Sequence, residues 1–369
     1  TKSMSSKRDK SNHNNKKYMR LALNLASQNS GLTGSNPSVG SVIVKNNEII
    51  SVGITSLGGR PHSETNAIKN CKHNLKNSTL YVSLEPCNHY GKTPPCTNLI
   101  IKSGIKKVYY AIDDVDPRTS NKSFNIFKEK KIKVIKNFML KDAKKLYKPY
   151  FITKSKKIPY IVGKIAASND NYIKSKKKYI TNKYSLKVSH LLRYKNDGVL
   201  ISYKTANSDN PRLNCRINGL EIFSPKRFII DKNLKIKQNL HLIDTAKKHK
   251  TYIFYNKSKN INKKLFLRKG VKLIKMKLNE EGNFDLSTIV KKIYSLGIYT
   301  LLIEGGVQLT DNFIKSKLLN EFYLFKSKKK LKNIGRLSMS ELIPKLSKYF
   351  KFKENVDTYL ESDKLTRYY

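Results

Sequence analysis

Four residues in two short segments have the types and the spacing of a metal site with its own proton carrier. His62 and Glu64 lie two positions apart after Pro61, and Cys87 and Cys96 each follow a proline. One imidazole and two thiolates leave the fourth tetrahedral position of Zn²⁺ open for water. Zinc lowers the pKa of that water, so that hydroxide becomes available near neutral pH. We therefore predict His62, Cys87 and Cys96 as zinc ligands and Glu64 as the catalytic group that carries protons.

The pattern is typical of hydrolytic deaminases, with one difference in spacing. Nucleobase deaminases carry His-x-Glu and Pro-Cys-x-x-Cys, whereas nine positions separate Cys87 from Cys96. A zinc ion that only stabilises the fold is an alternative, and so are two cysteines that are merely small buried residues. Glu64 argues against the first alternative, because a structural site has no need of that carboxylate. The joint spacing of all the residues argues against the second.

Composition indicates a two-domain protein without a disulfide framework. The chain has 369 residues, enough for two full cores, and four cysteines, two of which are predicted zinc ligands. We therefore expect a reducing compartment and a cytoplasmic location. The sequence contains no apolar run long enough to span a bilayer. Residues 1–16 lack the apolar region of a secretory signal, and we expect them to form a disordered basic tail.

The formal net charge of +49 is extreme, with 75 Lys and Arg against 26 Asp and Glu. Nucleic-acid binding is one interpretation, because backbone phosphates favour a basic surface. The basic residues are nevertheless spread along the chain, in loops such as 328–330 and in helical stretches such as 128–131, and do not form one stripe with aromatic residues. We therefore expect no nucleic-acid partner and no membrane, and we expect the charge to steer phosphate-bearing substrates.

Apolar periodicity predicts strands that alternate with helices, which is typical of an α/β layered fold. Asn46-Asn47 predicts a hairpin turn in the first half. Lys-rich sequence over 141–157 separates that half from a second one, so we expect domains at residues 17–149 and 158–369. The predicted strands are 39–44, 49–54, 79–84, 107–112, 132–135, 159–168, 198–202, 227–230 and 299–303, and the predicted helices are 18–29, 96–103, 124–130 and one that begins at 63.

With these motifs in view, the chain resembles the bifunctional deaminase/reductases of riboflavin biosynthesis. The resemblance covers nearly all of residues 18–335, and its most specific part is Gly-Lys-Thr-Pro-Pro-Cys over 91–96. The matching segments are 36–40, 61–64 and 84–96 in the first half, and 159–161, 167–170, 179–181, 191–193, 205, 209–213, 216 and 304–306 in the second half.

The resemblance implies a cytidine-deaminase-like three-layer α/β/α domain followed by a dihydrofolate-reductase-like α/β domain. The first domain is then a zinc-dependent deaminase of 2,5-diamino-6-(5-phosphoribosylamino)pyrimidin-4-one. The second domain then reduces the ribosyl group to ribityl with NADPH. The implied cofactors are one Zn²⁺ per deaminase domain and NADPH. The implied partners are a phosphorylated pyrimidine substrate and a second copy of the chain in a homodimer.

Roles for individual residues also follow from the resemblance, at the positions that match the family's motifs. Lys92 suits a phosphate as a point charge, and Arg193 and Arg216 suit one through their forked guanidinium groups. The implied substrate-binding residues are Asn36, His89, Lys92, Lys177, Arg193, Leu213, Arg216 and Glu304. The implied NADPH-binding residues are Ala166, Tyr179, Thr205, Asp209, Gly306, Val307 and Gln308.

Two further interpretations stay open at the level of the sequence. A zinc deaminase that acts on nucleic acid, such as tRNA, would use the positive charge, but it leaves the second half unexplained and predicts the shorter cysteine spacing. The second interpretation is a deaminase with a degenerate reductase half, because the chain departs from the family's pattern at Lys177, Tyr179 and 326–330.

Overall fold

The computed structural model describes residues 2–175, 179–257 and 260–369, and the chain divides into two units between Lys157 and Ile158. The first unit begins its sheet with the predicted hairpin. Asn46 and Asn47 have φ of 51° and 67°, the left-handed pair that a tight turn between antiparallel strands requires. The sheet has the order β2-β1-β3-β4-β5, antiparallel from β2 to β3 and parallel from β3 to β5. Its strands are β1 (Gly40–Lys45), β2 (Glu48–Ile54), β3 (Thr79–Val82), β4 (Lys107–Tyr110) and β5 (Lys133–Ile135).

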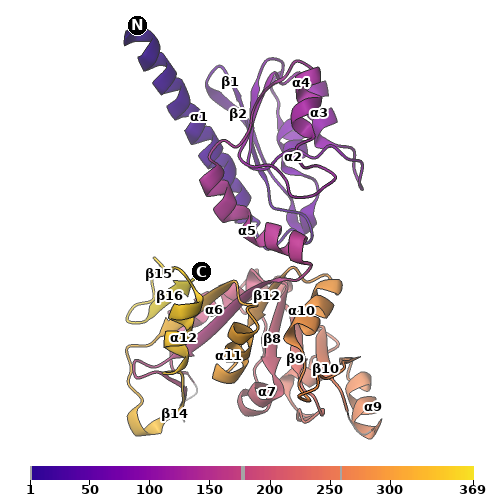
Figure 1. The fold of residues 1–369 in the computed structure, drawn as a ribbon, viewed down its shortest axis with the longest axis vertical. Coiled ribbons are helices and arrows are strands. Elements are labelled where there is room, and N and C mark those ends of the chain that lie inside the picture. Colours follow the sequence, from indigo (N-terminus) through magenta and orange to yellow (C-terminus); the bar gives the residue numbers. More distant parts are fainter. Residues whose placement is uncertain (1, 176–178, 258–259) are drawn as a thin grey trace. The chain divides into compact units, whose positions relative to one another are not determined.

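Helices cover both faces of this sheet, and two glycines allow their close approach (Figure 1). A Cβ atom on Gly40 would lie 2.0 Å from the carbonyl oxygen of Ala22 in α1, and one on Gly53 would lie 2.1 Å from that of Ser63 in α2. Gly53 pairs with Ser41, the neighbour of Gly40, so the two glycines face opposite sides of the sheet. The predicted three-layer α/β/α architecture is therefore confirmed. The helices are α1 (Lys2–Gln28), η1 (Leu57–Gly59), α2 (Ser63–Asn70), α3 (Cys96–Lys102), α4 (Ser123–Glu129) and α5 (Leu140–Lys156).

Two stretches of the first unit form helices that the sequence did not lead us to expect. Residues 2–16, predicted as a disordered tail, belong to α1, and Oδ1 of Asn15 accepts a hydrogen bond of 2.5 Å from the hydroxyl of Tyr81. A helix nucleated by its buried face extends into polar sequence at little cost. The Lys-rich stretch 141–157, predicted as a separator, forms most of α5, whose buried residues include Ala143 and Tyr147. The lysines obscured its apolar face in the sequence.

The second unit is built on a longer sheet that is parallel except at one end. Its order is β11-β10-β9-β8-β12-β6-β13-β16-β15, and among the described strands of this sheet the antiparallel pairs are β13 with β16 and β16 with β15. A separate pair, β14 with β7, lies outside it. The strands are β6 (Tyr160–Ala167), β7 (Tyr172–Ser175), β8 (Gly198–Ser202), β9 (Lys226–Ile230), β10 (Thr251–Tyr255), β11 (Lys272–Lys275), β12 (Thr300–Ile303), β13 (Glu321–Lys326), β14 (Gly335–Ser338), β15 (Lys353–Asn355) and β16 (Lys364–Tyr368).

Helices of the second unit bury both faces of this sheet. The main core joins the central strands to α10, α11 and α12, and a smaller cluster around Phe325 joins β13 to α6. Because the strands are covered on both faces, they read as nearly continuous apolar runs. Among the described residues, no helix is long and apolar enough to cross a membrane. The helices are α6 (Lys183–Tyr194), α7 (Tyr203–Asp209), η2 (Glu221–Phe223), α8 (His241–Asp244), α9 (Asn260–Arg268), α10 (Leu286–Ser295), α11 (Val307–Lys315), η3 (Lys332–Ile334) and α12 (Leu342–Tyr349).

Candidate functional site

Two helix N-termini in the first unit bring the predicted zinc ligands together. His62 directly precedes α2, Cys96 is the first residue of α3, and Cys87 lies in the loop after β3. Nδ1 of His62 lies 3.6 Å from Sγ of Cys87 and 3.3 Å from Sγ of Cys96. The three ligand atoms all lie within 4.8 Å of one another.

These separations fit a zinc ion. Bonds of about 2.3 Å to sulfur and about 2.0 Å to nitrogen, at tetrahedral angles, put a nitrogen and a sulfur about 3.5 Å apart. Nδ1 of His62 faces both sulfurs at about that distance, so Nδ1 is the ligating atom of the ring. One imidazole and two thiols supply three ligands, which leaves a fourth position for water or substrate.

The electrostatics of the three ligands favour a thiolate at Cys87. Hydrogen bonds from Cys96, including one from its backbone N–H at 3.3 Å, hold the pKa of the Cys87 thiol well below its usual range. The hydrogen bond to Cys87 and burial raise the pKa of the Cys96 thiol, because the two sulfurs share one proton. A metal would displace that proton on binding.

Glu64 is buried in the first turn of α2, close to the predicted metal ligands, but it is not one of them. Its side chain is 3 % exposed, and burial raises the pKa of its carboxyl group. Oγ of Ser63 donates to Oε2 of Glu64 at 3.0 Å, and Oγ of Ser41 lies 2.8 Å from Oγ of Ser63. Ser41 therefore supports the orientation of the carboxylate through Ser63, a role that its position in a strand did not reveal.

Glu85, which precedes Pro86 and Cys87, is a second residue that the sequence analysis missed. Its side chain is buried and accepts hydrogen bonds from the backbone N–H groups of Asp114, Asn121 and Ser123 at 3.1, 3.1 and 3.2 Å. This carboxylate therefore fixes the loop over 113–123 against the metal loop. A carboxylate at the end of a buried strand was the signal in the sequence.

The predicted substrate residues of the first unit lie on loops around the metal ligands. Asn36 donates through Nδ2 to the carbonyl of Gly59 at 2.9 Å. Nδ1 of His89 lies 3.1 Å from Oγ1 of Thr119, and Lys92 is exposed in the loop between the two cysteines. Their contact with a substrate stays a prediction.

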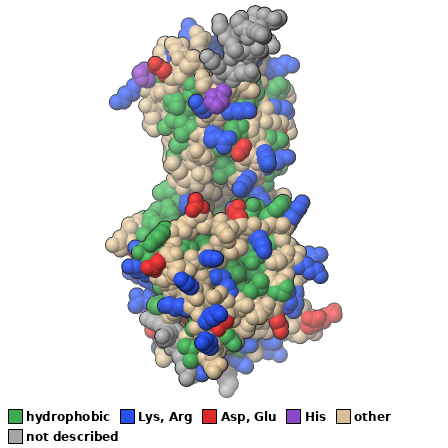
Figure 2. All heavy atoms as spheres, turned by 90° about the vertical axis from the view of Figure 1, so that its left-hand side faces the viewer, with side chains coloured by type: hydrophobic (Ala, Val, Ile, Leu, Met, Phe, Trp, Pro, Cys, Tyr) green, Lys and Arg blue, Asp and Glu red, His purple; other side chains and the backbone are tan. Residues whose placement is uncertain are grey.

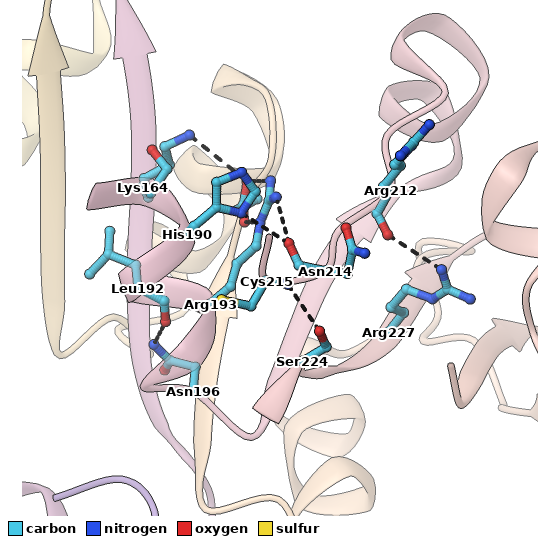
Figure 3. Close-up of polar contacts among 12 residues, drawn as sticks. Lys164, His190, Leu192, Arg193, Asn196, Arg212, Asn214, Cys215, Ser224 and Arg227 are labelled. Atoms are coloured by element: carbon cyan, nitrogen blue, oxygen red, sulfur yellow. Dashed lines mark hydrogen bonds and ion pairs between the residues drawn. The ribbon is translucent and has the colours of Figure 1, made fainter. Parts of the chain in front are cut away.

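In the second unit, Glu304 and Arg193 form a buried ion pair after β12. Nε and Nη2 of Arg193 donate to the two carboxylate oxygens of Glu304 at 2.6 and 2.9 Å. The guanidinium group of Arg193 thus binds Glu304, whereas the resemblance implied that it binds a phosphate of the substrate. Lys164 lies 3.8 Å from the same carboxylate, and Figure 3 shows Lys164 beside Arg193 and His190. Lys164 was missed, because a single lysine in a lysine-rich chain carries no signal.

Burial and charge act in opposite directions on this cluster. Burial opposes ionisation of Glu304, but Arg193 and Lys164 outweigh it and lower the pKa of Glu304 to about 2. Burial lowers the pKa of Lys164, although Glu304 opposes that shift. Burial and the charges of Arg193 and Arg216 lower the pKa of His190 to about 4, so this histidine is neutral at physiological pH.

The loop after α7 faces the same cluster (Figure 3). The carbonyl of Asn214 accepts from Nη1 of Arg193 at 3.2 Å, and Arg216 is exposed, with Nη1 donating to Oδ1 of Asn214 at 2.9 Å. Leu213 is 2 % exposed and has φ of 55°. Its backbone, rather than its buried side chain, is the part that a substrate could contact.

The predicted NADPH residues lie mainly at the carboxyl ends of parallel strands, where α/β sheets bind ligands. Gly306 precedes α11, which begins with Val307 and Gln308, and a Cβ atom on Gly306 would meet nothing within 4 Å. Open space at a helix N-terminus suits a phosphate. Ala166 lies in β6, Thr205 and Asp209 lie in α7, and Tyr179 is half exposed. Lys177 lies outside the described residues.

The segment over 326–330, which departs from the family's pattern, is held at its end by Asp170. Its carboxylate accepts from the backbone N–H groups of Leu331 and Lys332 at 2.9 and 2.8 Å. Lys326 hydrogen-bonds to the side chain of Asn171. The lysine-rich segment is therefore anchored to the turn between β6 and β7.

Comparisons with known proteins agree with these two sites. Residues 12–112 match the cytidine and deoxycytidylate deaminase zinc-binding region, and residues 159–327 match the RibD C-terminal domain. The riboflavin biosynthesis protein RibD of Aquifex aeolicus is 34% identical over 313 residues, 84% of this chain and 86% of that protein.

Two solved structures resemble nearly the whole chain. A diaminohydroxyphosphoribosylaminopyrimidine deaminase/5-amino-6-(5-phosphoribosylamino)uracil reductase from Thermotoga maritima has a TM-score of 0.80 and 27% identity, covering 96% of this chain and 98% of that one. RibD from Acinetobacter baumannii has a TM-score of 0.81 and 25% identity, covering 97% and 99%.

A zinc-binding deaminase unit followed by a reductase unit defines a bifunctional deaminase–reductase. The relatives identify which one. The chain belongs to the RibD family, and it is an enzyme of riboflavin biosynthesis.

Proposed function

We propose that the first unit deaminates 2,5-diamino-6-(5-phosphoribosylamino)pyrimidin-4-one and that the second unit then reduces the ribosyl group of the product to ribityl with NADPH. The observation that carries the proposal is the convergence of Nδ1 of His62 with both cysteine sulfurs, 3.3 and 3.6 Å away, beside the buried Glu64. The activity named for the Thermotoga maritima protein, which is similar over nearly all of this chain, supports the substrate.

In the deaminase unit, the chain's own residues hold the metal and move protons. His62, Cys87 and Cys96 would hold Zn²⁺, which when bound supplies a hydroxide equivalent at neutral pH. Glu64 accepts the proton of the attacking water and returns it to the amino group, which leaves as ammonia while a carbonyl oxygen replaces it. Ser63 orients Glu64 for both transfers. Asn36 and His89 would hold the pyrimidine, and Lys92 its phosphate.

In the reductase unit, the reaction adds a hydride to C1 of the ribosyl group, breaks the bond from C1 to the ring oxygen and places a proton on that oxygen. NADPH supplies the hydride when it is bound. The N-terminus of α11 with Gly306, Val307 and Gln308 would bind its phosphate groups. Arg193 and Lys164 keep Glu304 ionised, so that it can accept hydrogen bonds from sugar hydroxyls.

Mass analysis of the products tests both steps in one experiment. The purified protein is incubated with the pyrimidine, with and without NADPH. Without NADPH, we expect only the exchange of an amino group for a carbonyl oxygen. With NADPH, we expect the further gain of two hydrogens. An unchanged pyrimidine in both samples would refute the deaminase proposal. Deamination without the gain of two hydrogens in the presence of NADPH would show that the reductase unit is inactive.

The net charge of +49 favours one second candidate, a deaminase that acts on nucleic acid. On the face drawn in Figure 2, Lys and Arg side chains are spread over the surface instead of forming one stripe. A reductase unit also has no role in that candidate. RNA binding that weakens steeply with salt, together with release of ammonia from RNA, would support it against our proposal.

A further inference from the structure

The last helix of the first unit, α5, carries three polar side chains that contact loops near the deaminase site. Tyr147, Tyr150 and Lys154 are spaced three and four residues apart, which puts them on the same side of a helix. Each of them contacts a residue that lies far away in the sequence. The contacts fall on two separate loops. One loop carries the predicted substrate residue Asn36, and the other contacts the predicted substrate residue His89.

The first loop is the segment over 36–40. The hydroxyl of Tyr147 donates to the carbonyl of Ser38 at 3.1 Å and accepts from Oγ of Ser83 at 2.6 Å. Oγ of Ser83 in turn accepts from the backbone N–H of Gly40 at 2.9 Å. All of these side chains are buried, and Tyr147 itself is 3 % exposed. Tyr147 thus holds both ends of the backbone segment that follows Asn36.

The second loop lies over 113–119. The hydroxyl of Tyr150 donates to Oδ1 of Asp114 at 3.2 Å, and Nζ of Lys154 lies 3.6 Å from Oδ2 of Asp116. Oδ1 of Asp114 also accepts from the backbone N–H of Asp116 at 3.0 Å. The carboxylates of this loop are therefore tied to α5 at two points.

That loop reaches the metal loop through a buried threonine. The backbone N–H of Thr119 donates to the carbonyl of Asp116 at 2.8 Å, and Oγ1 of Thr119 lies 3.1 Å from Nδ1 of His89. Thr119 has no exposed surface, so its hydroxyl can turn only among fixed neighbours. The position of the His89 ring is therefore linked to α5 through Thr119 and Asp116.

We propose that α5 positions the substrate-binding loops of the deaminase, with Tyr147 acting on the loop of Asn36 and Tyr150 acting on the loop that orients His89. Both tyrosines are positioning residues, because each acts through the loop that its hydroxyl contacts. The inference depends on the proposed deaminase function and on Asn36 and His89 as contacts to the pyrimidine. It adds a helix that the spacing of the zinc motif does not include.

The test separates positioning from folding by the way the kinetic constants change. Tyr147→Phe and Tyr150→Phe each remove one hydroxyl and keep the ring. We expect each variant to raise KM for the diaminopyrimidine about 5- to 10-fold, as the loss of one buried hydrogen bond implies, with kcat changed less than about twofold. A purely structural role would reduce the folded fraction, which lowers the apparent kcat and leaves KM unchanged.

Tyr18→Phe is the matched control. Tyr18 belongs to the same unit, and its hydroxyl also bonds to a backbone carbonyl, that of Asn47 at 2.7 Å, but in the hairpin turn. We expect the parent KM for this variant. Zinc content and NADPH oxidation with the deaminated compound, measured on each variant, report on the folded state of the two units.

Asp114 supplies a second test from the other side of the contact. Asp114→Asn keeps an oxygen acceptor for Tyr150 and should keep KM within about twofold of the parent, whereas Asp114→Ala should raise KM as Tyr150→Phe does. If the parent deaminates but the tyrosine and Asp114→Ala variants share its KM, α5 has no positioning role. If the parent itself does not deaminate the compound, the proposed function fails instead.

Discussion

At the scale of single residues, Glu64 combines the two properties that a proton carrier needs. It is buried, which raises the pKa of its carboxyl group, and Ser63 orients it. Glu64→Gln keeps the size and an oxygen acceptor but cannot exchange protons. We expect ammonia release to fall by about 10²- to 10⁴-fold, while zinc content stays near the parent's. Deamination at the parent rate would show that Glu64 is not the proton carrier.

Asp114 gives a pH dependence whose direction follows from its burial. Burial raises the pKa of Asp114 to about 6, from 3.8 for the free group. The folded unit favours the protonated carboxyl group, so Asp114 contributes stability at pH values below the pKa of the unfolded state. That contribution to the free energy of unfolding, at most roughly 3 kcal/mol, is lost as pH rises through about 6. We therefore expect Asp114→Asn to gain stability relative to the parent between about pH 4 and pH 7.

Urea unfolding of the first unit at those two pH values measures the effect. Protonation of the zinc ligands affects parent and variant alike, so the difference between the two proteins isolates Asp114. Asp142→Asn is the control, because Asp142 belongs to the same unit, in α5, and has a side chain that is 51% exposed. A difference in free energy of unfolding that does not change with pH would contradict the prediction.

Glu304 behaves in the opposite way, since its lowered pKa stabilises the second unit above pH 4.5 and the contribution is lost as pH falls toward about 2. Glu304→Gln leaves Arg193 and Lys164 buried without their counter-charge. We expect this variant to lose about 3–5 kcal/mol of stability in the second unit and to lose NADPH oxidation, while ammonia release persists.

A matched variant separates the loss of charge from the loss of function. Glu321 pairs with Arg367 in the same unit, in a contact between β13 and β16. Glu321→Gln should also destabilise the unit, but at a temperature where it stays folded it should keep the parent KM for the deaminated compound. If both variants lose NADPH oxidation equally, Glu304 has only a structural role.

At the scale of helices and strands, local signals predicted most of the first unit. The Asn46-Asn47 turn, the helix starts at Ser63 and Cys96 and the strands around them all appear in the structure. The zinc ligands were predictable because three residues of rare types recur at fixed spacing. Ser41, Glu85 and Lys164 were not, because their roles arise from partners 22 or more positions away in the chain.

The elements that were missed have more than one physical cause. Helix α5 is rich in lysine, and lysine stems cover apolar surface while their charges stay in water. Such residues weaken the apolar periodicity that sequence analysis uses. The parallel strands β10 and β11 are short, and pairing that is distant in sequence leaves no local signal.

Gly53 shows how one element controls the metal site. A Cβ atom there would lie 2.1 Å from the carbonyl oxygen of Ser63 and 2.5 Å from the backbone nitrogen of Ala67, so α2 would have to move. Since α2 carries Glu64 and follows His62, we expect Gly53→Ala to lower zinc affinity and ammonia release and to cost about 1–3 kcal/mol. Val52→Ala, on the exposed face of β2, should change neither. Parent zinc affinity in Gly53→Ala would contradict this.

At the scale of the whole molecule, the two units have separate cores. The core of the first unit contains residues from Met19 to Tyr147, and that of the second contains residues from Ile158 to Tyr368. The division falls between Lys157 and Ile158. Folding and chemistry in one unit therefore need not depend on the site of the other.

Cys87→Ser tests this independence in the intact chain. The serine hydroxyl is a poor zinc ligand, so we expect the variant to lose both zinc and ammonia release. Because the second unit has its own core, NADPH oxidation with the deaminated compound should stay within about twofold of the parent rate. Cys71→Ser, at a cysteine outside the metal site, should leave both reactions unchanged. Loss of NADPH oxidation together with zinc would show that the metal site also supports the reductase unit, and the two activities would then have to be treated as one folding unit.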